Sequence, residues 1–311
     1  MPRTSPHRPS IREINLEGIR WIDVQEPNAA AIRKVLSGIS VHPLDIEDIL
    51  SPAQRPKLAR RGGYLFAVLR FARAGKRHVY SSELDAVISE RTLVTFHGRE
   101  LPRVREVMSD ATLFAAKRRE LLQHGPDYAL FEVLRRCYQD LYNATDQLSR
   151  QLDQLEEDIF VTHSRQTTFN VAELRRLITD HRKLAKPQAI FLRELGLALV
   201  EYVGNGTQEY WRTLPQIAES QWELLGGFHD TIETLADTDT TLASHKLNQT
   251  FRVLTIISAI FLPATFLTQL FALSVPGIPF SDLEFGFALV VAVLVLVELG
   301  FVFMLRRLKV L

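Results

Sequence analysis

Hydrophobic residues follow short repeating patterns through most of this chain and then gather into two long runs near its end. The first run, residues 253–281, contains no formally charged side chain, and the second, residues 285–305, contains only Glu298. A helix needs roughly 20 apolar residues to cross the hydrocarbon core of a bilayer. The pattern therefore predicts two membrane spans, at 253–275 and 285–305, joined by an outer loop at 276–284.

Residues 19–125 mix the periods of strands and helices. Runs such as IRWIDVQ and YLFAVLR have the branched and aromatic content of strands, and a short helix is expected to begin near Pro43. SSELDAVISERTLVTFH is read as a hairpin that turns near Glu90. These patterns predict an α/β domain. Residues 1–18 contain no apolar stretch of the kind found in secretory signals and are expected to be disordered.

The helical period takes over from residue 126. Residues 126–208 have apolar positions at three- and four-residue steps, which predicts long amphipathic arms, and Pro187 is expected to break the second arm. Residues 209–252 are predicted to form a stalk helix. No helix-breaking residue lies between Phe228 and the first span, so the stalk is expected to continue into the membrane.

Composition adds limits on partners and on orientation. The 37 Lys and Arg residues nearly balance the 36 Asp and Glu residues, which argues against a nucleic-acid surface. A single cysteine excludes a disulfide framework and a cysteine-based zinc site. Basic side chains flank the spans on the side away from the loop: Lys246, Arg252, Arg306, Arg307 and Lys309. By the positive-inside rule, the stalk and the basic tail at 306–311 both face the cytoplasm.

Polar side chains recur along one face of the first span. The positions at helical spacing are Asn248, Phe251, Leu254, Thr255, Ser258, Leu262, Thr265 and Gln269. In lipid, such side chains turn toward water-filled space or toward hydrogen-bond partners in neighbouring helices and their own backbone, so a pore lining and a packing face both remain open. Apolar rungs within this stripe suit a gate that closes by dewetting. One helix per chain encloses no pore, so the pore interpretation requires a homo-oligomer.

Four further residues are candidates for ion chemistry. Asp282 and Glu284 would form an acidic mouth if repeated around a ring, or would simply keep positive charge off the outer loop. Glu298 is either a proton relay or a structural hydrogen-bond donor to the inner helix. His245 either meets a soft divalent ion or is a solvated stalk residue. The remaining histidines considered are expected at surfaces or interfaces: His42, His97, His163, His181 and His229.

Three stretches resemble the CorA family of divalent-cation transporters: HPLDIEDIL with QRPKL and YLFAVLR (residues 42–70), ELDAVISERTLVTFH, and KLNQTFRVLTIISAIFLPATFLTQLF. The resemblance covers nearly the whole chain. It implies a homopentameric funnel in the bacterial inner membrane, with a cytoplasmic α/β/α domain, long stalk helices and two spans per subunit. It also implies that four positions match the family's pore constrictions: Asn248, Phe251, Leu254 and Leu262.

The chain departs from the family pattern at two places. Where CorA-like channels close the first span with Gly-Met-Asn, this chain has Ala272, Leu273 and Ser274. The neighbouring VPGIP and LPATFLTQLF are more similar to the zinc branch of the family, the ZntB type. The family's Tyr-Phe-Arg-Asp stretch is replaced by residues 210–213, where Thr213 stands in place of the aspartate of a magnesium-sensing site.

These features together predict divalent-cation transport, most like zinc transport, with proton coupling implied by the resemblance to the ZntB type. No cofactor is expected beyond the transported cation. A channel for magnesium, cobalt or nickel is the nearest alternative. A non-transporting, membrane-anchored metal sensor is an alternative from another class. The sequence shows no P-loop, nucleophile elbow or paired catalytic carboxylates, so an enzyme is not expected.

Overall fold

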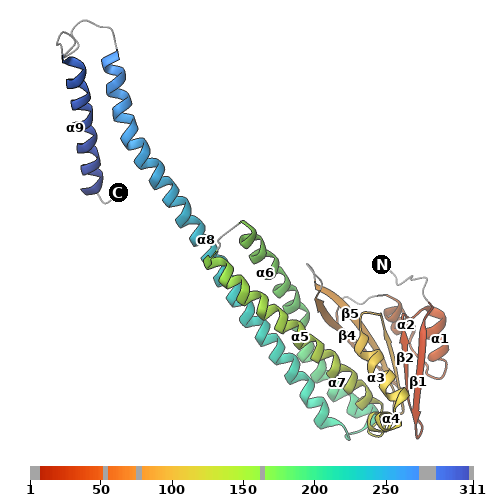
Figure 1. The fold of residues 1–311 in the computed structure, drawn as a ribbon. Coiled ribbons are helices and arrows are strands. Elements are labelled where there is room, and N and C mark those ends of the chain that lie inside the picture. The colour runs from red at the N-terminus through yellow and green to blue at the C-terminus, as the bar shows by residue number, and fades with distance from the viewer. Residues whose placement is uncertain (1–7, 52–54, 75–78, 162–164, 273–284, 308–311) are drawn as a thin grey trace. The chain divides into compact units, whose positions relative to one another are not determined.

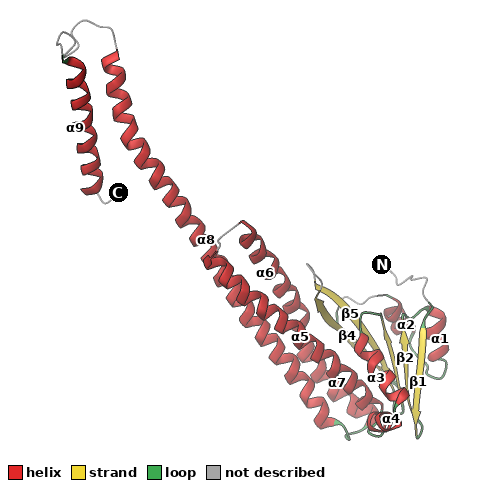
Figure 2. Cartoon of the chain, viewed as in Figure 1, coloured by secondary structure: helices red, strands yellow, loops and turns green. Residues whose placement is uncertain are grey.

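The computed structural model describes residues 8–51, 55–74, 79–161, 165–272 and 285–307, which Figure 1 colours along the chain. The chain divides into two compact units, an N-terminal unit, Met1–Ala236, and a C-terminal unit, Asp237–Leu311. All described strands lie in the N-terminal unit, and the described part of the C-terminal unit is helical (Figure 2).

A six-stranded mixed sheet is the centre of the N-terminal unit. Its strands are β1 (Ser10–Leu16), β2 (Ile19–Gln25), β3 (Lys57–Arg60), β4 (Leu65–Ala74), β5 (Val79–Ile88) and β6 (Thr92–His97). They lie in the order β1-β2-β6-β5-β4-β3, and every neighbouring pair is antiparallel except β2 with β6. The hairpin expected near Glu90 is confirmed, because β5 and β6 are neighbours joined through that residue.

The expectation of disorder over residues 1–18 is wrong for Ser10–Leu16, which form the edge strand β1. This strand pairs with β2 from Ser10 opposite Gln25 to Leu16 opposite Ile19. Glu17 and Gly18 join the two strands with φ of 51° and 84°, the pair of positive values that a tight two-residue hairpin turn requires. Residues 1–7 lie outside the described part of the chain.

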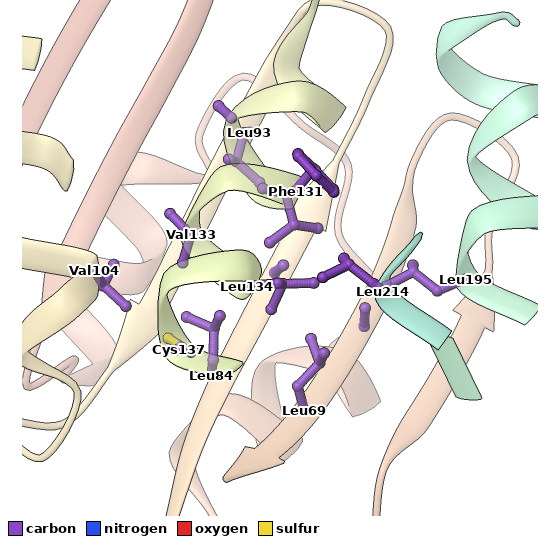
Figure 3. Close-up of a cluster of buried hydrophobic side chains, with 14 of the residues drawn as sticks. Leu69, Leu84, Leu93, Val104, Phe131, Val133, Leu134, Cys137, Leu195 and Leu214 are labelled. Atoms are coloured by element: carbon purple, nitrogen blue, oxygen red, sulfur yellow. The ribbon is translucent and has the colours of Figure 1, made fainter. Parts of the chain in front are cut away.

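Helices cover both faces of the sheet, which confirms the expected α/β/α layers. One face packs against α1 (Ala29–Val35) and α2 (Pro43–Leu50). The other packs against α3 (Pro102–Leu113), α4 (Ala115–Leu122), α5 (Pro126–Val161) and α7 (Gln188–Val203). Figure 3 shows this second core, where Leu69, Leu84 and Leu93 of the strands meet side chains from the helices: Val104, Phe131, Val133, Leu134, Cys137, Leu195 and Leu214.

A buried carboxylate holds α2 against the segment that joins β3 to β4. Asp45 is fully buried and accepts hydrogen bonds from the Arg61 guanidinium at 2.7 and 2.9 Å and from the Tyr64 hydroxyl at 2.7 Å. Burial alone would raise the pKa of Asp45. The hydrogen bonds from Arg61 and Tyr64, with the positive charges of Arg61 and Lys57, outweigh burial and lower this pKa below the ordinary value for a carboxyl. Asp45 is therefore held as a carboxylate.

Long helices follow the sheet. α5 has 36 residues, and the chain turns back through α6 (Arg165–Ala185) before α7. The break expected at Pro187 is confirmed, because α6 ends at Ala185 and α7 begins at Gln188. The stalk helix α8 (Gln208–Ala272) then runs for 65 residues without interruption, into the first predicted span.

Candidate functional site

The C-terminal unit carries the two helices that could cross a membrane. The most apolar 18-residue window has a mean hydropathy of 1.4 in α8 and of 2.8 in α9 (Gly286–Arg307), and no residue of either window is buried. Large apolar side chains lie in the open, such as Phe261, which is 65% exposed, and Phe303, which is 69% exposed. Soluble proteins rarely expose so much apolar surface to water, whereas such a surface is stable in contact with lipid.

The two spans are covered along one stripe each. The partly covered residues of α8 within the span are Ile256, Ala259, Ile260, Pro263 and Ala264. Those of α9 include Val290, Val293, Leu294, Glu298, Phe301 and Val302. Both sets recur at three- and four-residue steps, which places each on a single helix face. α8 and α9 are the only elements of the C-terminal unit in the residues that the structure describes, so these covered stripes mark their contact with each other.

The predicted pore stripe lies on the uncovered part of α8. All eight of its residues are exposed: Asn248, Phe251, Leu254, Thr255, Ser258, Leu262, Thr265 and Gln269. The hydroxyl of Thr255 donates to the carbonyl of Phe251 at 2.8 Å, and that of Thr265 donates to Phe261 at 2.7 Å. These two threonines thus use their protons within the helix, as the packing interpretation expects. Both side chains are exposed, and their oxygen lone pairs are able to accept hydrogen bonds from the water shell of a cation.

The outer end of the first span is described only as far as Ala272, the last residue of α8, which is exposed. Leu273, Ser274, Asp282 and Glu284 lie outside the described residues. Their roles at the outer mouth, and the pore-lining role of the stripe, stay predictions.

Glu298 faces the first span and not the lipid. It lies on the covered stripe of α9, and both of its carboxyl oxygens are buried. Neither oxygen accepts a hydrogen bond from the residues that the structure describes. A carboxyl group buried between two apolar helices without a partner is costly in lipid, so this position needs a chemical explanation.

Histidines do not assemble a metal site in the described part of a single chain, where no group of three or more His, Cys, Asp or Glu residues could hold an ion. His245 is exposed on α8, and its role as a ligand stays a prediction. The expectation that His97 and His181 lie at surfaces or interfaces is wrong, because both are buried within the N-terminal unit. His181 donates from Nδ1 to the Leu177 carbonyl at 3.0 Å, and burial lowers its pKa. Sequence spacing alone does not distinguish such a residue from an exposed one.

The first turn of α8 is fixed by a buried carboxylate that the sequence pattern did not single out. Asp127, at the beginning of α5, accepts hydrogen bonds from the Thr207 hydroxyl and from Trp211 Nε1, the latter at 3.3 Å. Burial raises the pKa of Asp127, and the two hydrogen bonds offset part of that rise. Trp211, which replaces the family's phenylalanine, therefore ties the stalk to α5. The Pro-Asp pair that opens a long helix was the available signal.

Thr213, in the place of the family's sensing aspartate, has a local role. Its hydroxyl donates to the carbonyl of Tyr210 one turn earlier, at 2.7 Å. The preceding guanidinium of Arg212 donates to Glu209 at 2.7 Å. The residues 210–213 thus present no carboxylate for a cation.

The chain matches a known protein family over nearly its whole length. Residues 17–307 match the family described as CorA-like Mg2+ transporter protein. The chain belongs to the CorA family. The cobalt/magnesium transport protein CorA of Thermotoga maritima is 25% identical over 282 residues, which cover 90% of this chain and 78% of that protein. The zinc transport protein ZntB of Pectobacterium carotovorum is 22% identical over 296 residues, which cover 93% and 83% of the two chains.

A solved structure supports the CorA fold over nearly the full length. The complete structure of the CorA magnesium transporter from Methanocaldococcus jannaschii superposes with a TM-score of 0.82, covering 95% of this chain and 93% of the other at 18% identity. At this identity the likeness establishes the fold alone. As a CorA-family member, the chain is a divalent-cation transporter of the membrane and not an enzyme. Its relatives carry names for cobalt, magnesium and zinc, so the family alone does not fix the ion.

Proposed function

We propose that this CorA-family chain forms a homopentamer in the bacterial inner membrane and carries divalent cations, zinc foremost, with both termini in the cytoplasm. The observation that carries the proposal is the uncovered stripe of α8. It is polar at intervals, and its eight residues are exposed in the described part of the chain. Copies of this face around a common axis would enclose a water-filled path.

The proposed path begins at the outer loop. Asp282 and Glu284, repeated around the ring, would raise the local concentration of cations. Ions would then pass Ser274 and descend along the hydroxyl and amide groups of the stripe, from Gln269 through Thr265 and Ser258 to Asn248. Phe251, Leu254 and Leu262 supply apolar rungs between these polar levels, which suits a gate that closes by excluding water.

The preference for zinc rests on the outer mouth. Ala272, Leu273 and Ser274 replace the Gly-Met-Asn that closes the first span in CorA-like magnesium channels. A serine hydroxyl is shorter than an asparagine side chain and has no amide, so a ring of Ser274 would hold the hydration shell of magnesium less well. The match to a zinc transport protein of the ZntB type supports the same choice.

Uptake into proteoliposomes tests the proposal. Zinc and magnesium fluxes are measured with and without a pH gradient, for the wild type and for Ser274→Asn. We expect zinc uptake that responds to the gradient, and a shift toward magnesium in Ser274→Asn. Ser220→Asn, the same change on an exposed site of the N-terminal unit, is the matched control and should leave both fluxes unchanged.

Two results would replace this proposal. Magnesium, cobalt or nickel uptake that ignores the pH gradient, with little zinc uptake, would favour a passive channel of the CorA type. Failure of every divalent ion to cross, in protein that still binds metal in its N-terminal unit, would favour a membrane-anchored sensor.

A further inference from the structure

A proline within the first span removes one backbone hydrogen bond of α8. Pro263 lies inside the helix and has no amide proton, so the carbonyl of Ala259, four residues earlier, loses its usual helical donor. Water is absent from the hydrocarbon core, where an unsatisfied backbone carbonyl is costly. Ala259 and Pro263 both lie on the covered stripe of α8, which is the face that meets α9. The second span is therefore the nearest source of a donor.

Glu298 occupies the matching level of that second span. Ala259 lies 13 residues before Ala272, where α8 ends, and Glu298 lies 12 residues after Gly286, where α9 begins. At the helical rise of 1.5 Å per residue, these positions are about 20 and about 18 Å from the ends that the outer loop joins. Two antiparallel spans of one hairpin thus bring both residues to nearly the same depth.

The two groups have complementary needs. The two buried oxygens of Glu298 accept no hydrogen bond from the described residues, and an ionised carboxylate is costly in lipid. With a proton, the same group becomes a donor. The Ala259 carbonyl is an acceptor that lacks a donor. A single hydrogen bond between them satisfies both, whereas an ionised Glu298 would place two acceptors face to face.

We propose that Glu298 is a neutral carboxylic acid whose hydroxyl donates to the main-chain carbonyl of Ala259, which Pro263 leaves free. Glu298 is in this role a positioning residue. It holds α9 against α8 at the level of Pro263. It thereby sets the orientation of the uncovered stripe, which lies on the face of α8 that points away from α9. In this role Glu298 keeps its proton while cations are transported. Its hydrogen bond to Ala259 does not depend on which cation the protein carries.

A double-mutant cycle tests the pairing in the full-length protein in proteoliposomes and detergent. Glu298→Leu removes the donor and is expected to lower both the thermal unfolding midpoint and the rate of divalent-cation uptake several-fold. Pro263→Ala restores an amide to α8 and gives the Ala259 carbonyl its helical donor. In the Pro263→Ala background, Glu298→Leu should therefore cost little further. Pro215→Ala, at a proline of the same helix in the N-terminal unit, is the matched control and should not suppress the effect of Glu298→Leu.

The conservative variant separates a hydrogen-bond donor from a proton carrier. Glu298→Gln keeps an N–H donor of similar length but cannot ionise, so it should retain wild-type stability, uptake and response to a pH gradient. Infrared difference spectra of wild type against Glu298→Gln should show a carboxylic-acid C=O band that persists as external pH is varied. A carboxylate band, or loss of uptake in Glu298→Gln as large as in Glu298→Leu, would overturn the proposal. So would an undiminished effect of Glu298→Leu in the Pro263→Ala background, because the partner would then lie elsewhere.

Discussion

Asp45 shows how one buried charge holds a short helix in place. Its Arg61 and Tyr64 partners leave the carboxylate fully paired, and removal of one member of a buried pair leaves the other without compensation. We expect Asp45→Ala to lower the free energy of unfolding of the N-terminal unit by about 3 kcal/mol. Asp48→Ala on the same helix, where both Asp48 and its partner Lys57 are partly exposed, should cost about 1 kcal/mol or less. All three tryptophans lie in this unit, so tryptophan fluorescence follows its unfolding.

The pH dependence of this contribution follows from the lowered pKa of Asp45. A carboxyl whose folded pKa is depressed stabilises the fold above its unfolded pKa of about 3.9, and the contribution disappears as pH falls through the lower, folded value. The difference in unfolding midpoint between wild type and Asp45→Ala should therefore shrink on acidification. A difference that stays constant down to the acid limit would contradict the assignment.

Asp127 is the opposite case, because burial outweighs its hydrogen bonds and leaves its pKa raised. A group with a raised folded pKa stabilises the fold fully below its unfolded pKa of about 3.9, and this stabilisation is lost as pH rises through the folded value. Asp127→Asn keeps an acceptor oxygen for Thr207 and Trp211 but does not titrate. We expect its unfolding midpoint to gain on the wild type as pH rises from about 4 to about 7. Parallel pH profiles for the two proteins would show that Asp127 is not titrating in this range.

At the scale of elements, the contact between α7 and α8 depends on a glycine. A Cβ built on Gly196 would lie 3.1 Å from the Cβ of Trp211, and Trp211 has little freedom to move because Asp127 holds its indole. We expect Gly196→Ala to lower the unfolding midpoint, although alanine favours a helix by up to about 1 kcal/mol over glycine. Gly227→Ala in α8, where a Cβ meets nothing within 4 Å, should raise the midpoint instead. If both changes shifted the unfolding midpoint equally, helix propensity alone would explain the effects, and the contact between Gly196 and Trp211 would contribute nothing.

Which elements were predictable depended on how many apolar positions each one buries. The central strands β4 and β5 and the 36-residue α5 have strong periodic patterns and were readable from the sequence. Both edge strands, β1 and β3, went unpredicted, because an edge strand covers little core. Ile14 is the one residue of β1 that is buried, and β3 has no buried residue. Partnership with a neighbour, and not the local pattern, makes these segments strands.

The candidate site was predictable to a different extent. Helical spacing was enough to place the polar stripe of α8 on one face, because polar residues stand out against an apolar span. It did not reveal which apolar face meets α9, because lipid-facing and helix-facing positions in a membrane are equally hydrophobic. The exposure of each residue in the structure identifies that face: Ala259 and Pro263 lie on the covered stripe of α8, and Glu298 lies on that of α9.

At the scale of the whole molecule, the proposed assembly predicts which helix faces meet between subunits. Cys137 is the only cysteine in the sequence, and it is buried. Burial raises its pKa to about 12, so its thiol reacts little with oxidants. The change Cys137→Ser removes this remaining reactivity. In this background, Leu262→Cys places a thiol on the uncovered stripe, and Ile260→Cys places one on the covered stripe. If the uncovered stripe surrounds the axis, oxidation should link subunits through residue 262 and leave residue 260 unlinked.

The yield of this reaction also reports the number of subunits. Each chain carries one introduced thiol, so cross-linking stops at dimers, and a ring of five leaves one chain without a partner. The dimer fraction should therefore saturate at about four-fifths of the chains, whereas a ring with an even number of subunits allows complete conversion. Cross-linking through residue 260 in preference to residue 262 would place the polar stripe away from the axis and remove the basis of the proposed ion path.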